Sequence, residues 1–166
     1  MSCYHKIFQI QSDRRPTFND VTEQMLEAIQ RSEIKNGIVT VYSQHTTCAV
    51  LIQEQSDDVN YYGTQLILQD MVNGLEKLFP RCTTEGQYLH PGPLHIEIAG
   101  RERGEEAFWS LNTDAHLRSV MLGRSVTVPI VEGEAQLGEF GRVYFADFDQ
   151  VRARERQVRI CVLGDK

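Results

Sequence analysis

Three strand-like segments follow one another at the C-terminal end of the sequence with no helix between them. They occupy residues 125–131, 140–149 and 157–163 and are rich in β-branched and aliphatic side chains. Successive strands joined by short turns pair antiparallel, whereas parallel strands need long crossover connections. The sequence therefore predicts an α+β fold with a mixed, largely antiparallel β-sheet core.

Further strands are expected in the first third of the chain. Residues 4–10 alternate between apolar and polar types, as in a strand with one buried face. Residues 38–42 and 48–52 are also strand-like, and we expect them to pair around the polar segment 44–47.

Two main helices and one short helix complete the prediction. The first begins near Thr17 or Asn19 and carries apolar residues at helical spacing. The second begins at Ser56 or Asp57 and is closed by Pro80. Residues 112–122 form the short helix, whereas residues 81–106 are rich in glycine and proline and offer one short strand at 94–98.

Length and charge limit the classes of function. The 166 residues contain no linker-like stretch and indicate a single domain spanning 1–166. The formal net charge of −6 excludes a nonspecific grip on nucleic acid over the whole surface, and no apolar run is long enough to span a bilayer. The four scattered cysteines favour reduced thiols in a cytoplasmic protein.

The histidines are the most informative polar residues. His45, His90 and His116 lie on three separate segments, so the fold would have to assemble them into a metal site. Neutral imidazole suits zinc and similar divalent ions. The alternative is a set of unrelated polar histidines, and His5 and His95 are interpreted as structural because they alternate with apolar residues.

Acidic residues after the second strand of the expected pair suggest a magnesium site. Glu54, Asp57 and Asp58 offer carboxylate oxygens, which magnesium prefers and combines with substrate phosphates. Alternatively, Asp57 caps the second main helix and Asp58 favours its positive end. Glu54 has no assignable capping role.

A third group predicts anion binding near the short helix. Arg118, Ser119 and Arg124 flank its end, and the arginine fork matches phosphate oxygens. Alternatively, these arginines are solvated near a helix C-terminus, where positive charge is favourable. Arg154 and Arg156 are interpreted as part of a charged turn.

Five blocks of the sequence, in order, resemble the YjbQ-like family. The blocks are residues 44–54 (QHTTCAVLIQE), 88–90 (YLH), 115–125 (AHLRSVMLGRS), 128–130 (VPI) and 136–140 (QLGEF). The sequence departs from the family pattern at Gln53, at Asp58 and at Phe140–Gly141. An insertion adds residues 94–108.

The resemblance implies an α+β fold, a homotrimer and secondary thiamine-phosphate synthase activity. In that reaction a hydroxymethylpyrimidine diphosphate joins a thiazole phosphate and releases pyrophosphate. His45, His90 and His116 would bind a divalent metal ion, Mg²⁺ or Zn²⁺. Catalysis would use His45, Glu54 and His116.

The small phosphorylated substrate would be held by residues on two segments, namely Asp57, Arg118, Ser119 and Arg124. Two alternatives stay open. One is a metal-dependent hydrolase of a small phosphorylated or cyclic substrate, and the other is a non-catalytic trimeric protein that binds a metal or ligand.

Overall fold

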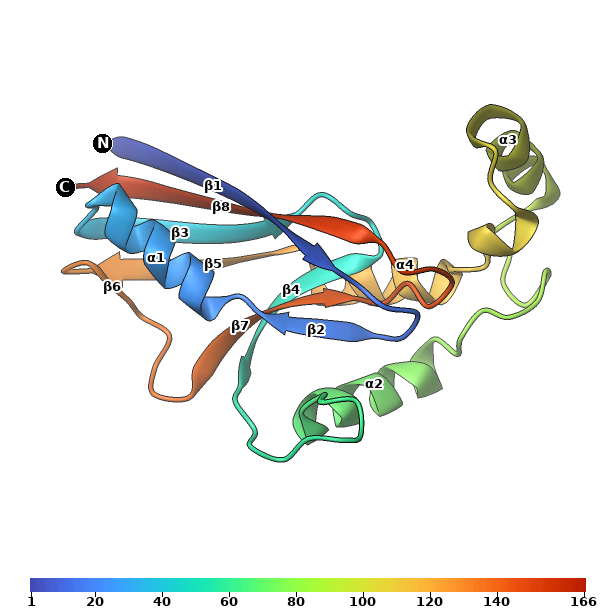
Figure 1. Ribbon diagram of the computed structural model, residues 1–166, viewed down its shortest axis with the longest axis horizontal. Helices are drawn as coiled ribbons and strands as arrows, with labels where there is room; N and C mark the ends of the chain where they lie inside the picture. Colours follow the sequence, from blue (N-terminus) through green and yellow to red (C-terminus); the bar gives the residue numbers. More distant parts are fainter.

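The computed structural model describes residues 1–166 as two β-sheets with helices packed against them (Figure 1). The strands are β1 (Ser2–Gln11), β2 (Thr17–Asp20), β3 (Asn36–Ser43), β4 (Cys48–Glu54), β5 (Ser125–Val131), β6 (Glu134–Ala135), β7 (Gly141–Asp147) and β8 (Glu155–Asp165). The helices are α1 (Thr22–Ser32), α2 (Leu66–Leu78), α3 (Pro93–Arg103), the short 3₁₀ helix η1 (Ala107–Ser110) and α4 (Thr113–Leu122).

Both sheets are antiparallel throughout. The larger sheet has the strand order β1-β8-β3-β5-β6, and the smaller has the order β2-β7-β4. The N- and C-terminal strands β1 and β8 therefore lie side by side, with both chain ends at the same end of the molecule (Figure 1).

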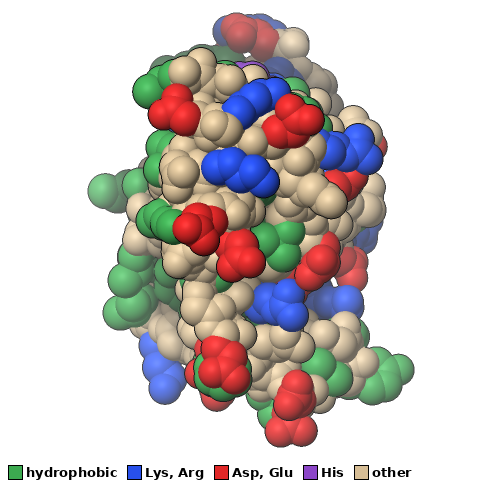
Figure 2. Space-filling view, turned by 90° about the vertical axis from the view of Figure 1, so that its left-hand side faces the viewer, with side chains coloured by type: hydrophobic (Ala, Val, Ile, Leu, Met, Phe, Trp, Pro, Cys, Tyr) green, Lys and Arg blue, Asp and Glu red, His purple; other side chains and the backbone are tan.

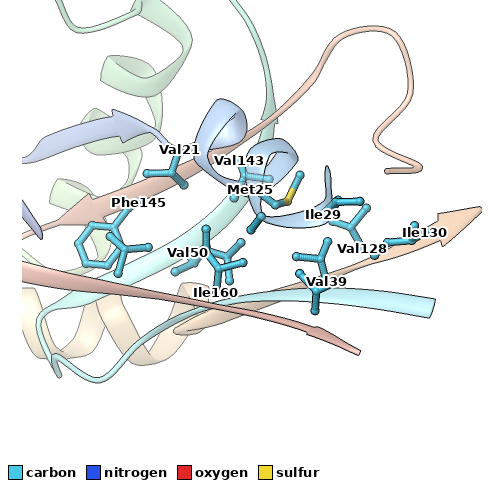
Figure 3. Packing of buried hydrophobic residues seen from close by; sticks show 14 of the residues in the cluster. Val21, Met25, Ile29, Val39, Val50, Val128, Ile130, Val143, Phe145 and Ile160 are labelled. Carbon is cyan, nitrogen blue, oxygen red and sulfur yellow. The ribbon is translucent and has the colours of Figure 1, made fainter. Parts of the chain in front are cut away.

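The main hydrophobic core lies between the two sheets and α1. Met25 and Ile29 of α1 meet aliphatic side chains from both sheets, such as Val39 and Ile160 of the larger and Val50 of the smaller (Figure 3). Alternation along β8 buries every second residue, which gives the larger sheet one core face and one outer face. Burial of this apolar surface is the main force that holds the two sheets together.

A second, smaller cluster covers the outer face of the smaller sheet. Ala49 of β4 and Ala146 of β7 contribute small side chains to it, and Leu75 of α2 and Ala115 of α4 close over them. Small residues on both sides let α4 approach β4 closely. The hydroxyl of Ser119 on α4 donates a 2.6 Å hydrogen bond to the carbonyl oxygen of Cys48 and fixes the helix to the strand.

The predicted α+β class with a largely antiparallel core is confirmed, as are the three C-terminal strands. The predicted pairing of 38–42 with 48–52 is wrong. β3 pairs with β5 and β8, whereas β4 pairs with β7 in the other sheet. Both segments are apolar enough to be buried, and alternation alone does not identify the partner strand.

Three other local predictions differ from the structure. Thr17 and Asn19, which are expected to cap the first helix, lie instead in the short strand β2, which pairs with β7. Asp20 Oδ1 accepts a hydrogen bond from the backbone amide of Thr22, the first residue of α1. The second main helix begins at Leu66 rather than at residue 56. Residues 94–98 lie in the helix α3, which Pro93 begins at its first turn and Gly104 ends with a positive φ.

No helix in the structure combines the length and the apolar character that a membrane crossing requires. The face at the end of the molecule that carries the chain termini mixes acidic and basic side chains without a single-sign patch (Figure 2). This face therefore has no basic field of the kind that nonspecific nucleic-acid binding uses.

Gly37 of β3 and Gly164 of β8 lie opposite each other, and substitutions there test how closely the two strands approach. A Cβ on Gly37 would lie 2.1 Å from the carbonyl oxygen of Leu163, and one on Gly164 would lie 2.2 Å from that of Asn36. Because the neighbours are backbone atoms, Gly37→Ala and Gly164→Ala should each lower the free energy of unfolding by about 1–3 kcal/mol. Urea denaturation measures this change.

Gly74→Ala is the matched control, because Gly74 lies inside α2 and an added Cβ would meet nothing within 4 Å. That substitution should raise stability by about 0.5–1 kcal/mol. Equal effects at all three positions would contradict the close approach of β3 and β8.

Candidate functional site

A polar cleft of about 310 Å³ lies where the β3–β4 connection, the start of β8, α3 and α4 meet. Trp109 is the single hydrophobic residue in its lining, which otherwise consists of Gln44, His45, Thr46, Thr47, His95, Glu105, Ser110, Asn112, His116, Arg154 and Arg156. These residues come from four separate parts of the chain. A cleft with so few apolar walls suits a polar or charged ligand.

A buried ion pair forms the floor of the cleft. Arg156 is 4% exposed and donates two hydrogen bonds to the carboxylate of Asp147, at 2.7 Å from Nε and 3.3 Å from Nη2. Its Nη2 also donates to Thr47 Oγ1 at 3.0 Å, and that hydroxyl donates to Asp147 Oδ1. The arginine thereby links β8, β7 and the β3–β4 connection, and its paired charge satisfies the condition for burying an ion.

A second pair beside it leaves polar atoms available. Arg154 Nη2 lies 3.2 Å from the fully buried carboxylate of Asp149, but the buried Nε of Arg154 has no hydrogen-bond partner. The hydroxyl of Ser110, another lining residue, is also buried without a partner. Unpaired buried polar atoms cost stability and point toward a bound ligand.

His45 is held in one tautomer by the backbone of β8. Its Nε2 accepts a 2.9 Å hydrogen bond from the amide of Gln157, so in the neutral ring Nδ1 carries the proton. Both ring nitrogens are then occupied, and His45 is suited to hydrogen bonding rather than to ligating a metal.

His116 is held in the same tautomer as His45, but the backbone contacts its other ring nitrogen. Its Nδ1 lies 3.1 Å from the carbonyl oxygen of Thr46, which only accepts hydrogen bonds, so Nδ1 carries the proton and Nε2 keeps a free lone pair. A backbone carbonyl that fixes the far nitrogen in this way is typical of metal-ligating histidines.

Three histidine rings gather at this end of the cleft. The ring centroid of His90 lies 4.6 Å from that of His95 on α3 and 6.1 Å from that of His116 on α4. Thr113, which begins α4, donates a hydrogen bond to the carbonyl oxygen of His90 and ties its segment to the helix. The rings are neighbours, but their donor atoms do not all lie within 4.8 Å of one another.

Burial favours the neutral form of these imidazoles. It is the main cause that lowers the pKa of His45, His90 and His116 below the ordinary value of 6.5. The nearby guanidinium of Arg156 lowers the pKa of His45 further, and the rings of His95 and His116 do the same for His90. Neutral imidazole is the form that binds metals and accepts protons.

The structure places two of the predicted phosphate-binding residues in the interior. Arg118 is fully buried, where its guanidinium donates to Glu76 and to the carbonyl oxygen of Phe79 and lies 3.5 Å from Asp114. Ser119 is 1% exposed and bonded to β4. The prediction that these two residues bind substrate is corrected: they join α4 to the rest of the fold.

Arg124, Glu54 and Asp57, which are also predicted site residues, lie outside the cleft. Arg124 donates a 3.4 Å hydrogen bond to the carbonyl oxygen of Gln44 and does not line the cavity. Glu54 ends β4, about 20 Å along the strand from Cys48, and both Glu54 and Asp57 are exposed there. The structure therefore does not bring these carboxylates to the histidines.

The sequence reasoning missed His95, Arg154 and Arg156. The sequence predicts His95 to be a structural strand residue, whereas helix α3 carries it to His90. Arg154 and Arg156 are predicted as part of a charged turn, but each lies in an ion pair, in which Arg156 is buried and Arg154 is half-buried. Two features of the sequence could have identified them. Proline is favoured in the first turn of a helix, so Pro93 indicates that α3 begins there. Arg154, Arg156 and Val158 are each two residues apart, so in a strand both arginines point to the same face as the buried Val158.

Comparison with known proteins gives consistent matches over nearly the whole chain. The family model described as UPF0047 protein YjbQ-like matches residues 6–165. A UPF0047 protein of Methanocaldococcus jannaschii is 31% identical over 159 residues, covering 96% of this chain and 94% of the relative. One from Methanothermobacter thermautotrophicus is 30% identical, covering 99% and 94%.

Solved structures of similar proteins share the fold. A YbjQ-like protein of unknown function from Sulfolobus solfataricus superposes with a TM-score of 0.76 at 21% identity, covering 99% of both chains. An uncharacterized YjbQ/UPF0047 protein from Clostridium acetobutylicum gives a TM-score of 0.72 at 24% identity, covering 95% of this chain and 99% of that one.

The predicted thiamine-phosphate synthase activity is wrong. The relatives are named only as UPF0047 proteins, and the solved structures are described as uncharacterized or of unknown function. The site agrees with this correction, because Arg118 and Ser119 are not available to a diphosphate.

The buried pair beneath the cleft gives a direct test of its energetic role. Arg156→Met leaves the Asp147 carboxylate buried without its partner and should lower the free energy of unfolding by about 3–5 kcal/mol. The control is Arg142→Met, which breaks an exposed pair with Glu23 and should cost no more than about 1 kcal/mol. Urea denaturation compares the two, and similar losses would contradict the assignment.

Proposed function

The chain belongs to the UPF0047 family of YjbQ-like proteins, and we propose that its cleft binds a divalent metal ion together with a small phosphorylated ligand. The metal ligands are His90, His95 and His116. The observation that carries the proposal is the ring cluster itself, in which the Thr46 carbonyl fixes His116 so that Nε2 is free.

The proposed ligand set replaces His45 with His95. The backbone amide of Gln157 occupies Nε2 of His45, which leaves that ring no lone pair for a metal. His95 lies closer to His90 than His116 does. Binding requires side-chain rotations at His90 and His95 that turn their free nitrogens toward Nε2 of His116.

Zinc or a similar ion fits this donor set better than magnesium. Imidazole nitrogen suits zinc, whereas magnesium prefers carboxylate oxygen, and Glu54 and Asp57 lie away from the rings. Three protein ligands leave a fourth position open toward the cleft.

The phosphorylated ligand would sit beside this position. Arg154 and Ser110 of η1 both line the cleft, and the Nε of Arg154 and the hydroxyl of Ser110 are buried without hydrogen-bond partners. The amide side chains of Gln44 and Asn112 add further hydrogen-bonding groups. A guanidinium with unused donors and a set of neutral hydrogen-bonding groups matches the oxygens of a phosphate.

Calorimetric titration of the metal-free protein with Zn²⁺ tests the proposal. His116→Ala and His95→Ala should each weaken binding at the cleft by more than about 100-fold, because each removes a ligand rather than an outer partner. His45→Gln should leave zinc affinity within about tenfold of the parent. Loss of affinity in His45→Gln but not in His95→Ala would contradict the proposed set.

Phosphate binding separates the two parts of the site. Arg154→Met should keep the zinc affinity of the parent and lose binding of inorganic phosphate to the zinc-loaded protein. An Arg154 variant with unchanged phosphate affinity would contradict the ligand assignment.

The affinity for zinc should also depend on pH. Since burial lowers the pKa of His90 and His116, zinc affinity should fall on acidification only below about pH 6.5.

We also propose a homotrimer in the cytoplasm, as the family resemblance implies. The buried free thiols of Cys48 and Cys82 fit a reducing compartment such as the cytoplasm. The trimer would cover large apolar side chains of α4 that are exposed to solvent in the single chain, including Val120 at 75% and Met121 at 57% exposure. Sedimentation equilibrium should give three times the mass of the chain, and the mass of one chain would contradict the trimer.

A further inference from the structure

A group of metal-ligating side chains lies on the larger sheet, separate from the histidine cleft. Cys3 and His5 of the edge strand β1 and Cys161 of β8 place one sulfur, one nitrogen and one sulfur within 4.8 Å of one another. It is the one group of three or more histidine, cysteine or acidic residues in the structure whose donor atoms gather this closely.

The strand geometry brings these three side chains together. Cys3 and His5 are two residues apart and so point to the same face of β1. His5 lies directly opposite Cys161 in the antiparallel register, while Cys3 lies opposite Leu163. Cys3 and Cys161 are therefore diagonal neighbours, and the arrangement is set by the backbone pairing rather than by a flexible loop.

The distances match a tetrahedral zinc site. The sulfurs of Cys3 and Cys161 are 3.7 Å apart, and Cys3 Sγ lies 3.2 Å from His5 Nε2. Zinc bonds of about 2.3 Å to sulfur and about 2.0–2.1 Å to nitrogen place tetrahedral ligands roughly 3.8 Å and 3.6 Å apart. The sulfur spacing fits closely, and the nitrogen needs to move by only a few tenths of an ångström.

The same register disfavours a disulfide bond. Diagonal residues on neighbouring antiparallel strands have Cα atoms about 7–8 Å apart. Disulfides usually join Cα atoms about 4.4–6.8 Å apart. The two thiols lie in contact, yet linking them would require β1 to shift against β8, a pairing that runs over all ten residues of β1.

We propose that Cys3, His5 and Cys161 bind one Zn²⁺ ion at the edge of the larger sheet. Two thiolates and one imidazole form a borderline-soft donor set that selects zinc over magnesium or calcium. Two thiolates also neutralise the charge of the ion. Since Cys3 and His5 are exposed, water completes the coordination, and the ion fastens the N-terminal strand to the C-terminal one.

This site is independent of the proposed function of the cleft. Cys161 lies about 13 Å along β8 from Gln157, the residue that holds His45. Arg159, between them on the same face, donates to the side-chain oxygens of Gln44 and Gln157 and does not occupy the thiol pair. The two sites also differ chemically, because only one of them contains sulfur.

Titration of the full-length, reduced, metal-free protein with Co²⁺ tests the proposal. Cobalt bound by thiolate gives a sulfur-to-metal charge-transfer absorption, which the all-histidine cleft does not produce. We expect this absorption to saturate at one Co²⁺ per chain and to be displaced by Zn²⁺. Cys3→Ser and Cys161→Ser should abolish it, and His5→Ala should weaken binding by more than about 100-fold.

Two controls separate this site from the rest of the molecule. Cys82→Ala removes a buried thiol in another part of the fold and should keep the absorption. His116→Ala should also keep it, whatever its effect on the cleft. Failure of the cleft proposal would therefore leave this result unchanged, and the reverse also holds.

Thiol labelling supplies a second readout. Cys48, whose pKa burial raises to about 12, and the buried Cys82 should stay unreactive in the folded protein. Zinc should protect Cys3 and Cys161 from the reagent. The proposal is overturned if the parent shows no charge-transfer absorption, if Cys3→Ser retains it, or if mild oxidation joins Cys3 to Cys161 while zinc gives no protection.

Discussion

The ion pair between Arg156 and Asp147 is the interaction on which the candidate site depends. It joins the first residues of β8 to the last residue of β7, and through Thr47 it fixes the connection from β3 to β4. Burying two charges is costly unless both are paired and hydrogen-bonded, and here each partner uses several bonds. The histidines on either side of this floor take their orientation from backbone atoms of the same segments.

The crossing of the chain from one sheet to the other creates the cleft. β3 belongs to the larger sheet and β4 to the smaller, so residues 44–47 bridge the open end of the sandwich. The same bridge carries His45 and supplies the carbonyl oxygen that orients His116. Had β3 and β4 formed the expected hairpin, these residues would have been an ordinary turn at the edge of one sheet.

Helix α3 and η1 close the other side and lie in a part of the chain that local patterns describe poorly. The expected strand at 94–98 would have left His95 alternating with apolar neighbours, but in the helix its ring meets that of His90 edge to face. Three of the five histidines thus share one location, and His95 takes the place that the sequence prediction gives to His45. Arg154 and Arg156 are predicted as part of a charged turn, because a run of charges gives no sign of partners that lie on another segment.

The amino-acid sequence is enough to identify the local elements. These are the strands β1, β5 and β8, which alternation predicts, and the short helix α4, which Gly123 ends; together they indicate an antiparallel α+β fold. Tertiary structure alone decided which strands pair, that Arg118 is buried against Glu76 and Asp114, and that Cys3 and His5 meet Cys161 from the far end of the chain. The reason is physical. Periodicity reports which face of a segment is buried, whereas the identity of its neighbour depends on contacts between residues more than a hundred positions apart.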